Sequence, residues 1–352
     1  MKPSVRVVAP GLMTTLQDFG RRGYQRLGIP VSGALDTVSL RAANMLVGNP
    51  QGTGALEIAY QGPTLAVEAD SVRVAFAGGS AVIDIITEQG AASTQRLPPL
   101  QSLRLSKGQI LRIGALSGSA IAYLAVEGGF DIATALGSQS TYARAGLGGQ
   151  HGRALRQGDL LPLRRAHAEE RQECMLPSLD LAAPRRFRVV LGPQDDYFTN
   201  DGKRTFLESI YTVTPASDRM GMRLAGPLLE HAKGFNIVSD GIAPGSIQVP
   251  GNGLPIVLLA DRQTTGGYPK IATVISADMP ALGRLTPGAK VAFAAVDIAA
   301  AEAAHGQLLA DIEAIARSIV PVRAATIDAT KLLESNLVSG MIDAHDWRPE
   351  RA

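Results

Sequence analysis

The sequence predicts a mainly β protein built from two related modules, on three observations. Short segments rich in β-branched and aliphatic residues end at Gly or Pro within a few residues, which is typical of strands; the clearest are 5–8, 71–76, 187–191 and 256–259. Helical patterns are few: one follows Asp36, a typical N-cap, and ends near Gly48, and an Ala-rich one covers about 298–319. A regular alternation of strands and helices, and with it a doubly wound fold, is therefore disfavoured.

Internal repetition is the third observation. A turn of the form Gly-x-x-aliphatic-x-aliphatic occurs at 108–113, 158–163 and 288–293. A longer match joins 122–134 to 256–273: an apolar strand, a glycine pair with an aromatic residue, then Ile-Ala-Thr. Chance similarity between Gly-rich β segments is the alternative, and we favour duplication. We expect an N-terminal module at 1–163, a charged linker at 164–183, a C-terminal module at 184–320 and a peripheral tail at 321–352, with a short helix near Lys331 to Leu337.

Composition limits the class of protein. The 352 residues suffice for about two domains, at roughly 100–200 residues each. The 34 Lys and Arg nearly balance 32 Asp and Glu without a basic cluster, so no nucleic-acid partner is expected. One cysteine, Cys174, excludes an intramolecular disulfide and fits a reducing compartment. The first residues lack the apolar core of a signal peptide, and apolar runs such as 254–260 are shorter than the ~18 residues of a membrane span. We expect a cytoplasmic protein without a membrane partner.

Familiar catalytic motifs are not recognisable. The five histidines lack metal-ligand spacing, so no metal site is expected. Gly202-Lys203 is followed by Arg204 and lacks the earlier glycine of a phosphate-binding loop. The Gly-rich run 146–152 has His151 where a dinucleotide loop needs its third glycine, and it is better interpreted as a flexible β connection. Catalysis by this chain alone is not predicted.

Three polar segments remain, at 14–36, 217–224 and 261–268. Arg219 and Arg223 are four residues apart, and we expect them to share a face where paired guanidiniums would suit a carboxylate or phosphate. The alternative is a surface ion pair with Asp218 or a nearby acid. The segment 261–268 offers a carboxylate, an amide, two hydroxyls and a glycine pair directly after an apolar strand. This segment predicts the rim of a small-molecule binding site, and a polar hairpin turn is the alternative.

These three segments resemble those of the allophanate hydrolase subunit 2/KipA family, which includes one of the subunits of bacterial 5-oxoprolinase and the carboxyltransferase region of urea carboxylase. The matching stretches are TTLQDFGRRGYQRLGIPVSGALD (14–36), AANMLVGN (42–49), LEIAYQGP (56–63), SDRMGMRL (217–224), SDGIAPGSIQVPGNGLPIVLLADRQTTGGYPKIATVISAD (239–278) and LTPG (285–288). The resemblance implies a fold of two cyclophilin-like β-barrel modules with a few helices, which agrees with the repetition.

The resemblance also implies a function. Bacterial members work with a KipI-like subunit and a LamB/YcsF-like subunit to convert 5-oxoproline to glutamate with ATP. The leading hypothesis is therefore a hydrolase subunit that is active only with its partners and shares ATP with one of them. The alternatives are a biotin-dependent carboxyltransferase subunit, with biotin as cofactor, and a non-enzymatic regulator that binds a KipI-like protein.

Under the leading hypothesis, Arg219 or Arg223 would hold the substrate carboxylate and Asp261 would position or deprotonate water. Oxyanion donors would come from Gln248, Gln263 and Thr264. The predicted catalytic residues are Asp261, Gln263 and Thr264, and the predicted substrate-binding residues are Arg219, Arg223, Gln248, Thr265 and Tyr268. A further cluster, Gln17, Asp18, Arg21 and Asp36, is expected near the module junction or partner surface, facing the cleft that carries Asp261. Its alternative is an internal network in which Asp18 pairs with Arg21 and Asp36 caps the following helix.

Overall fold

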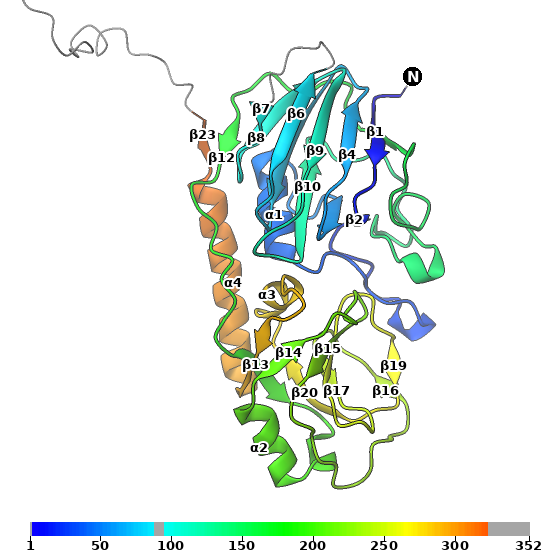
Figure 1. Ribbon diagram of the computed structural model, residues 1–352, viewed down its shortest axis with the longest axis vertical. Helices are drawn as coiled ribbons and strands as arrows, with labels where there is room; N and C mark the ends of the chain where they lie inside the picture. Colours follow the sequence, from blue (N-terminus) through cyan, green and yellow to red (C-terminus); the bar gives the residue numbers. More distant parts are fainter. Residues whose placement is uncertain (1, 88–94, 323–352) are drawn as a thin grey trace, which may run out of the picture.

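The N-terminal module consists of two facing β-sheets. The computed structural model describes residues 2–87 and 95–322, and its two modules lie one above the other (Figure 1). One sheet has the order β11-β1-β4-β9-β6-β7 and the other β2-β3-β10-β5-β8. The strands of the first are β1 (Ser4–Ala9), β4 (Thr64–Val67), β6 (Ile83–Thr87), β7 (Gln95–Arg96), β9 (Gln109–Ile113) and β11 (Leu160–Pro162). Those of the second are β2 (Met13–Gln17), β3 (Ala55–Ala59), β5 (Ser71–Ala77), β8 (Ser102–Ser106) and β10 (Ile121–Val126).

The strand β10 shows how this module is packed. All its residues are buried, because Ala122, Leu124 and Val126 face the core between the sheets while the alternate side chains contact α1 (Thr37–Leu46). The Asp36 side chain accepts hydrogen bonds from the backbone amides of Val38 (3.0 Å) and Ser39 (3.1 Å). The predicted capped helix is therefore confirmed.

The C-terminal module is built on an eight-stranded sheet with the order β21-β14-β15-β18-β17-β20-β13-β22. Its strands are β13 (Phe187–Leu191), β14 (Tyr211–Val213), β15 (Gly221–Ala225), β17 (Ser246–Gln248), β18 (Ile256–Leu258), β20 (Lys270–Val274), β21 (Lys290–Val291) and β22 (Phe293–Ala295). A ribbon of β16 (Asp240–Gly241) and β19 (Thr265–Gly266) and the helices α2 (Asn200–Glu208) and α3 (Met279–Gly283) complete it. In its core, the rings of Phe206 and Phe293 stack with centroids 4.7 Å apart.

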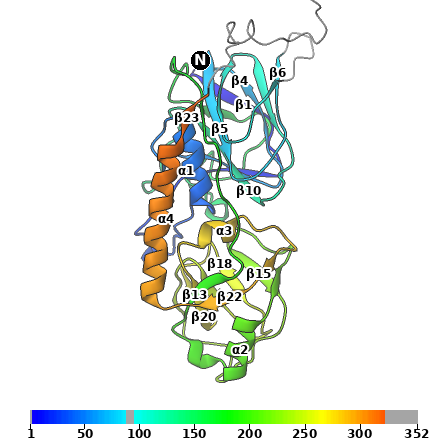
Figure 2. The same cartoon turned by 90° about the vertical axis from the view of Figure 1, so that its left-hand side faces the viewer.

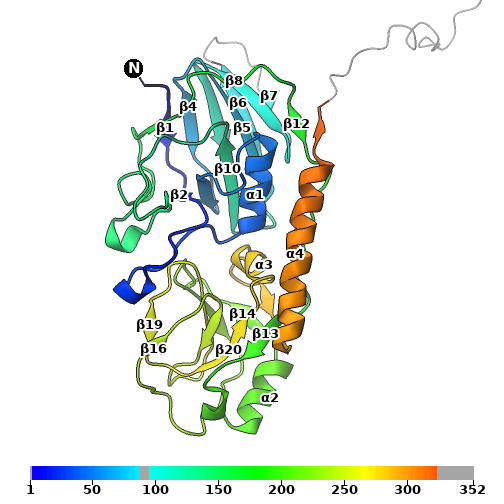
Figure 3. The same cartoon turned by 180° about the vertical axis from the view of Figure 1, so that it is seen from behind.

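The long helix α4 (Ile298–Ser318) runs along both modules, as Figures 2 and 3 show from two sides. It contacts β13 of the C-terminal module and α1 of the N-terminal module. Ile312 is its one fully buried residue. After it, β23 (Val320–Pro321) pairs with β12 (Cys174–Met175) of the connecting segment. The predicted Ala-rich helix is confirmed, whereas the helix predicted near Lys331 lies outside the described residues.

The mainly β fold class with a few helices is confirmed. Short 3-10 helices occur at Gln25–Leu27 (η1), Ala143–Ala145 (η2) and Asp195–Tyr197 (η3). The repeated turn glycines Gly108, Gly158 and Gly288 all have a left-handed backbone, with φ of 84°, 86° and 89°, a conformation that favours glycine. Within residues 2–87 and 95–322, no helix is long and apolar enough to cross a membrane.

We expect Ile312→Ala to loosen α4 without unfolding the sheets. Loss of a buried isoleucine side chain costs about 2–5 kcal/mol, and α4 has no second fully buried side chain to hold it. Amide hydrogen exchange over 298–318 should accelerate at least about tenfold, while β10 and β18 stay protected. The matched control is Glu313→Ala at an exposed neighbour, and equal exchange in both variants would contradict this anchoring role.

Candidate functional site

A buried ion-pair network joins the two modules. Arg219 lies in the turn before β15, and its Nε donates to Oδ2 of Asp261 at 2.8 Å and its Nη2 to Oδ1 at 3.2 Å. The same guanidinium donates through Nη1 to Glu57 on β3 and through Nη2 to the carbonyl of Gly33 at 2.7 Å, both in the N-terminal module. Burial opposes the positive charge, but Glu57 and Asp261 outweigh that effect and raise the pKa of Arg219. Arg219 thus stays charged between two carboxylates.

The network continues through Tyr123 to a second inter-module ion pair. The Tyr123 hydroxyl donates to Glu57 at 2.5 Å and accepts from the backbone amide of Asp36 at 3.0 Å. Burial, and then the charge of Glu57, raise the pKa of Tyr123 well above its usual value, so the hydroxyl keeps its proton. Asp36 also accepts from Nη1 of Arg284, in the C-terminal module, at 2.7 Å. The chain Asp261–Arg219–Glu57–Tyr123–Asp36–Arg284 therefore crosses the junction twice.

The structure separates the two arginines that were expected to share a face. Arg219 precedes β15 in a turn, so the alternation of that strand does not extend back to it, while Arg223 is exposed on β15. Asp261 is only 8% exposed and lines none of the cavities described below. The substrate-binding role of Arg219 and the catalytic role of Asp261 stay predictions. In the structure, the guanidinium of Arg219 and the carboxylate of Asp261 bind each other at the module junction.

Several predicted residues do meet around a polar cleft of about 420 Å³. Gln263 donates to Oε1 of Gln248 at 3.2 Å, and Gln248 donates to the carbonyl of Tyr268 at 3.4 Å. A side chain at Gly266 would lie 2.5 Å from the Gln248 amide, so this glycine leaves room for it. The polar side chains that line the cleft are Arg144, Asp218, Arg223, Gln248, Asn252, Gln263 and Tyr268. We name this cavity the polar cleft.

Arg144, like Asn252, is a cleft residue that the sequence did not single out. It lies on η2 of the N-terminal module, opposite a cleft otherwise built by the C-terminal module. Arg144 and Arg223 are both exposed, and neither forms an ion pair with any residue that the structure describes. The only signal was the neighbouring Gly-rich run 146–152, which marked a loop but not its direction.

The N-terminal cluster holds the loop that carries Arg144. Asp18 accepts from the Ser138 hydroxyl and from the Gln139 amide, each at 2.6 Å. Arg21 is buried and donates to the carbonyls of Ala135 and Ser140. Burial lowers the pKa of Arg21, against the opposing charges of Asp18 and Asp261.

The other two members of this cluster have internal partners as well. Gln17 donates to the carbonyl of Thr141 at 3.1 Å, so it also binds the loop at 135–141. Asp36 caps α1 and pairs with Arg284, as described above. A role for these four residues at a partner surface stays a prediction.

The two predicted threonines line neither cavity. The carbonyl of Thr264 accepts from the Ile242 amide at 3.0 Å, and Thr265 pairs with Gly241 in the β16–β19 ribbon. Within the described ranges, no three or more His, Cys, Asp or Glu side chains gather as a group that could hold a metal ion.

Comparison with known proteins gives the family. Residues 27–295 match the model of the carboxyltransferase domain, subdomain A and B, and the chain belongs to this family, as its motifs predicted. It is 37% identical over 290 residues to a 5-oxoprolinase subunit of Escherichia coli K12, covering 82% of this chain and 90% of that protein. It is 30% identical over 311 residues to urea amidolyase of Saccharomyces cerevisiae, covering 82% of this chain and 16% of that protein.

A solved structure agrees with this assignment. The fold matches the crystal structure of Kluyveromyces lactis urea amidolyase with a TM-score of 0.79 and 30% identity, over 90% of this chain. The chain spans only 20% of that enzyme, so it corresponds to one region of it.

Removal of Arg219 should destabilise the protein strongly. Arg219→Met leaves Glu57 and Asp261 buried without their cation, and breaking a buried ion pair on one side costs about 3–5 kcal/mol. Arg223→Met, four residues further on and exposed, should change the free energy of unfolding by no more than about 0.5 kcal/mol. Chemical denaturation measures both, and similar values for the two variants would disprove the junction role of Arg219.

Arg21→Ala separates the two interpretations of the N-terminal cluster. The buried hydrogen bonds from Arg21 to Ala135 and Ser140 predict a lower melting temperature. An unchanged melting temperature with weakened binding of a partner subunit would instead favour an interface. Differential scanning calorimetry and a partner-binding titration on the same preparation distinguish these outcomes.

Proposed function

We propose that this chain is a subunit of an ATP-dependent 5-oxoprolinase complex, which hydrolyses 5-oxo-L-proline to L-glutamate. The observation that carries the proposal is the polar cleft, where exposed Arg144 and Arg223 from different modules lie beside the paired amides of Gln248 and Gln263. The 37% identity to the 5-oxoprolinase subunit of Escherichia coli, over most of both chains, supports it.

The substrate class suits the cleft chemically. 5-Oxoproline is a small lactam with one carboxylate, and arginine binds carboxylates through two parallel N–H donors. In the proposal, Arg223 and Arg144 hold that carboxylate. The amides of Gln248 and Gln263 face the lactam and donate to its carbonyl oxygen as negative charge develops there.

Hydrolysis also needs a group that takes a proton from water. Asp218 lines the cleft, and its Oδ1 accepts from the amides of Met220 (2.8 Å) and Gly221 (3.0 Å), which fixes the carboxylate in its turn. We assign the general-base role to Asp218 rather than to Asp261, whose two oxygens bind Arg219. Water oxygen would then bond to the carbonyl carbon, the ring C–N bond would break, and the nitrogen would take up a proton.

The lysine and arginine of the Gly-Lys-Arg run at 202–204 are engaged in ion pairs. Lys203, the lysine of the Gly-Lys-Arg run, pairs with Asp195 at 3.4 Å, and Arg204 pairs with Asp201 at 2.7 Å, both on or near α2. The proposal places ATP at a site supplied or completed by a partner, which the resemblance identifies as a KipI-like or a LamB/YcsF-like subunit.

A biotin-dependent carboxyltransferase is the second candidate, favoured by the family match and by the urea amidolyase relatives. Carboxybiotin would then supply the carboxyl group. The amides of Gln248 and Gln263 would stabilise the oxygen of biotin as that group leaves.

Reconstitution tests the proposal. ATP hydrolysis is measured with and without 5-oxoproline for this chain alone and for its mixture with both partner subunits. We expect negligible activity alone and 5-oxoproline-dependent hydrolysis in the mixture. Full activity of the lone chain would reject the shared site, and biotin-dependent carboxylation of urea would establish the second candidate.

The cleft itself is tested in the reconstituted mixture. Arg223→Met and Arg144→Met should each raise the KM for 5-oxoproline about tenfold or more, because a hydrogen bond to a charged group contributes about 1.5–3 kcal/mol. Arg204→Met, on the exposed face of α2, is the matched control and should leave KM unchanged. An unchanged KM in both cleft variants would remove the cleft from the proposal.

A further inference from the structure

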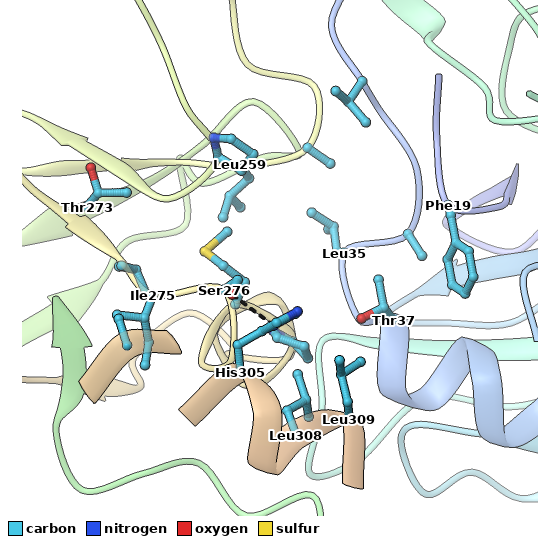
Figure 4. A pocket seen from close by; sticks show the side chains of 18 of the residues that line it. Phe19, Leu35, Thr37, Leu259, Thr273, Ile275, Ser276, His305, Leu308 and Leu309 are labelled. Carbon is cyan, nitrogen blue, oxygen red and sulfur yellow. Dashed lines mark hydrogen bonds between the residues drawn. The ribbon is translucent and has the colours of Figure 1, made fainter. Parts of the chain in front are cut away.

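A second and larger cavity lies between the modules, against α4. It has a volume of about 710 Å³, within the range of small-molecule sites. Figure 4 shows its labelled apolar side chains, which come from the segment before α1, from the C-terminal sheet and from α4. The apolar residues that line the cavity include Leu35, Leu259, Ile275, Met279, Leu308 and Leu309. We name it the apolar cavity.

A buried arginine without a counterion lines this cavity. Arg262 is 1% exposed, and its Nε and Nη1 donate only to the carbonyls of Ile242 (3.2 Å) and Leu259 (3.4 Å). Its Nη2 has no partner among the described residues, and no described carboxylate lies within 4 Å of the guanidinium. Glu302 also lines the cavity, from the exposed side of α4, without pairing with Arg262.

Two more residues that line the same cavity carry an unsatisfied polar atom. The Ser32 hydroxyl is buried without a partner, on a residue whose φ is +55°. Nε of Arg41 is also unpartnered, while its guanidinium lies 4.4 Å from the centroid of the Phe19 ring. Three unsatisfied buried groups around one cavity are unusual, because buried polar atoms are nearly always hydrogen-bonded.

The charge of Arg262 defines the missing partner. Burial lowers the pKa of Arg262 to about 10, so it remains protonated at neutral pH. A buried cation without a counterion is strongly unfavourable, and an anion in the cavity would remove that cost. The surrounding leucines and isoleucine require the rest of the same molecule to be apolar.

We propose that the apolar cavity binds a small amphipathic carboxylate, with its head group on Arg262 and Ser32 and its apolar body among the leucines of α4 and Leu259. The site differs from the polar cleft, because Arg262 and its neighbour Gln263 line different cavities. It does not depend on the proposed 5-oxoprolinase function.

Decanoate and decanol, both below the concentrations at which they aggregate, test the proposal by isothermal titration calorimetry on the full chain. They share an apolar body and differ in the head group. We expect decanoate to bind the wild type at least tenfold more tightly than decanol, and Arg262→Met to abolish that preference. Equal binding by the wild type, or a preference that survives in Arg262→Met, would overturn the proposal.

A pair of variants on α4 locates the binding. Ala301 lines the cavity, whereas exposed Ala303 does not. Ala301→Trp should fill the cavity and abolish decanoate binding, while Ala303→Trp should leave it unchanged; equal behaviour would place the binding elsewhere. Arg262→Met should melt no lower than the wild type without ligand, since it removes a buried unpaired charge. If that variant does not fold, the head-group comparison and the α4 pair still decide the outcome.

Discussion

The arrangement of the two modules depends on one buried guanidinium. Arg219 contacts Glu57 and Asp261, one carboxylate from each module. Rotation of one module against the other would break one of these ion pairs and leave a buried charge without its partner. An apolar junction would tolerate sliding, because hydrophobic contact is non-directional. Hydrogen bonds to a planar fork of donors have a defined geometry, and Tyr123 extends that geometry to the Asp36–Arg284 pair. We infer that this network specifies the orientation of the modules more than it stabilises the protein.

Three consecutive residues illustrate how the junction organises the candidate sites. Asp261 belongs to the ion-pair network, Arg262 lines the apolar cavity and Gln263 lines the polar cleft. The chain turns at Asp261 shortly after β18, so successive side chains leave in different directions and one short loop contributes to three environments. Both cavities also have walls from both modules, through Arg144 in the cleft and Leu35 in the cavity. Their shapes therefore depend on the orientation that Arg219 fixes.

Sequence patterns predicted the fold better than the site. Strand and helix signals are local, so the β segments, the Asp36 cap and the Ala-rich helix could be inferred from neighbouring residues. Two residues of the motif at 261–268, Gln263 and Tyr268, line the polar cleft, and their roles stay predictions. The direction of each side chain could not be inferred, because it depends on where a turn ends and a strand begins, as at Arg219 and Arg223. Arg144 was missed for a related reason: it reaches the cleft from the other module, and no local pattern encodes that approach.

The contrast between Arg219 and Arg262 shows what a buried arginine can indicate. Both are largely enclosed, yet two carboxylates raise the pKa of Arg219, whereas burial alone lowers that of Arg262. A buried charge whose partners all lie within the chain is explained by folding. A buried charge without partners raises the free energy of the folded state. Arg262 is such a charge, and it lines a cavity with room for a ligand. The amino acid is the same in both places, and its surroundings decide whether it is interpreted as part of the scaffold or as part of a binding site.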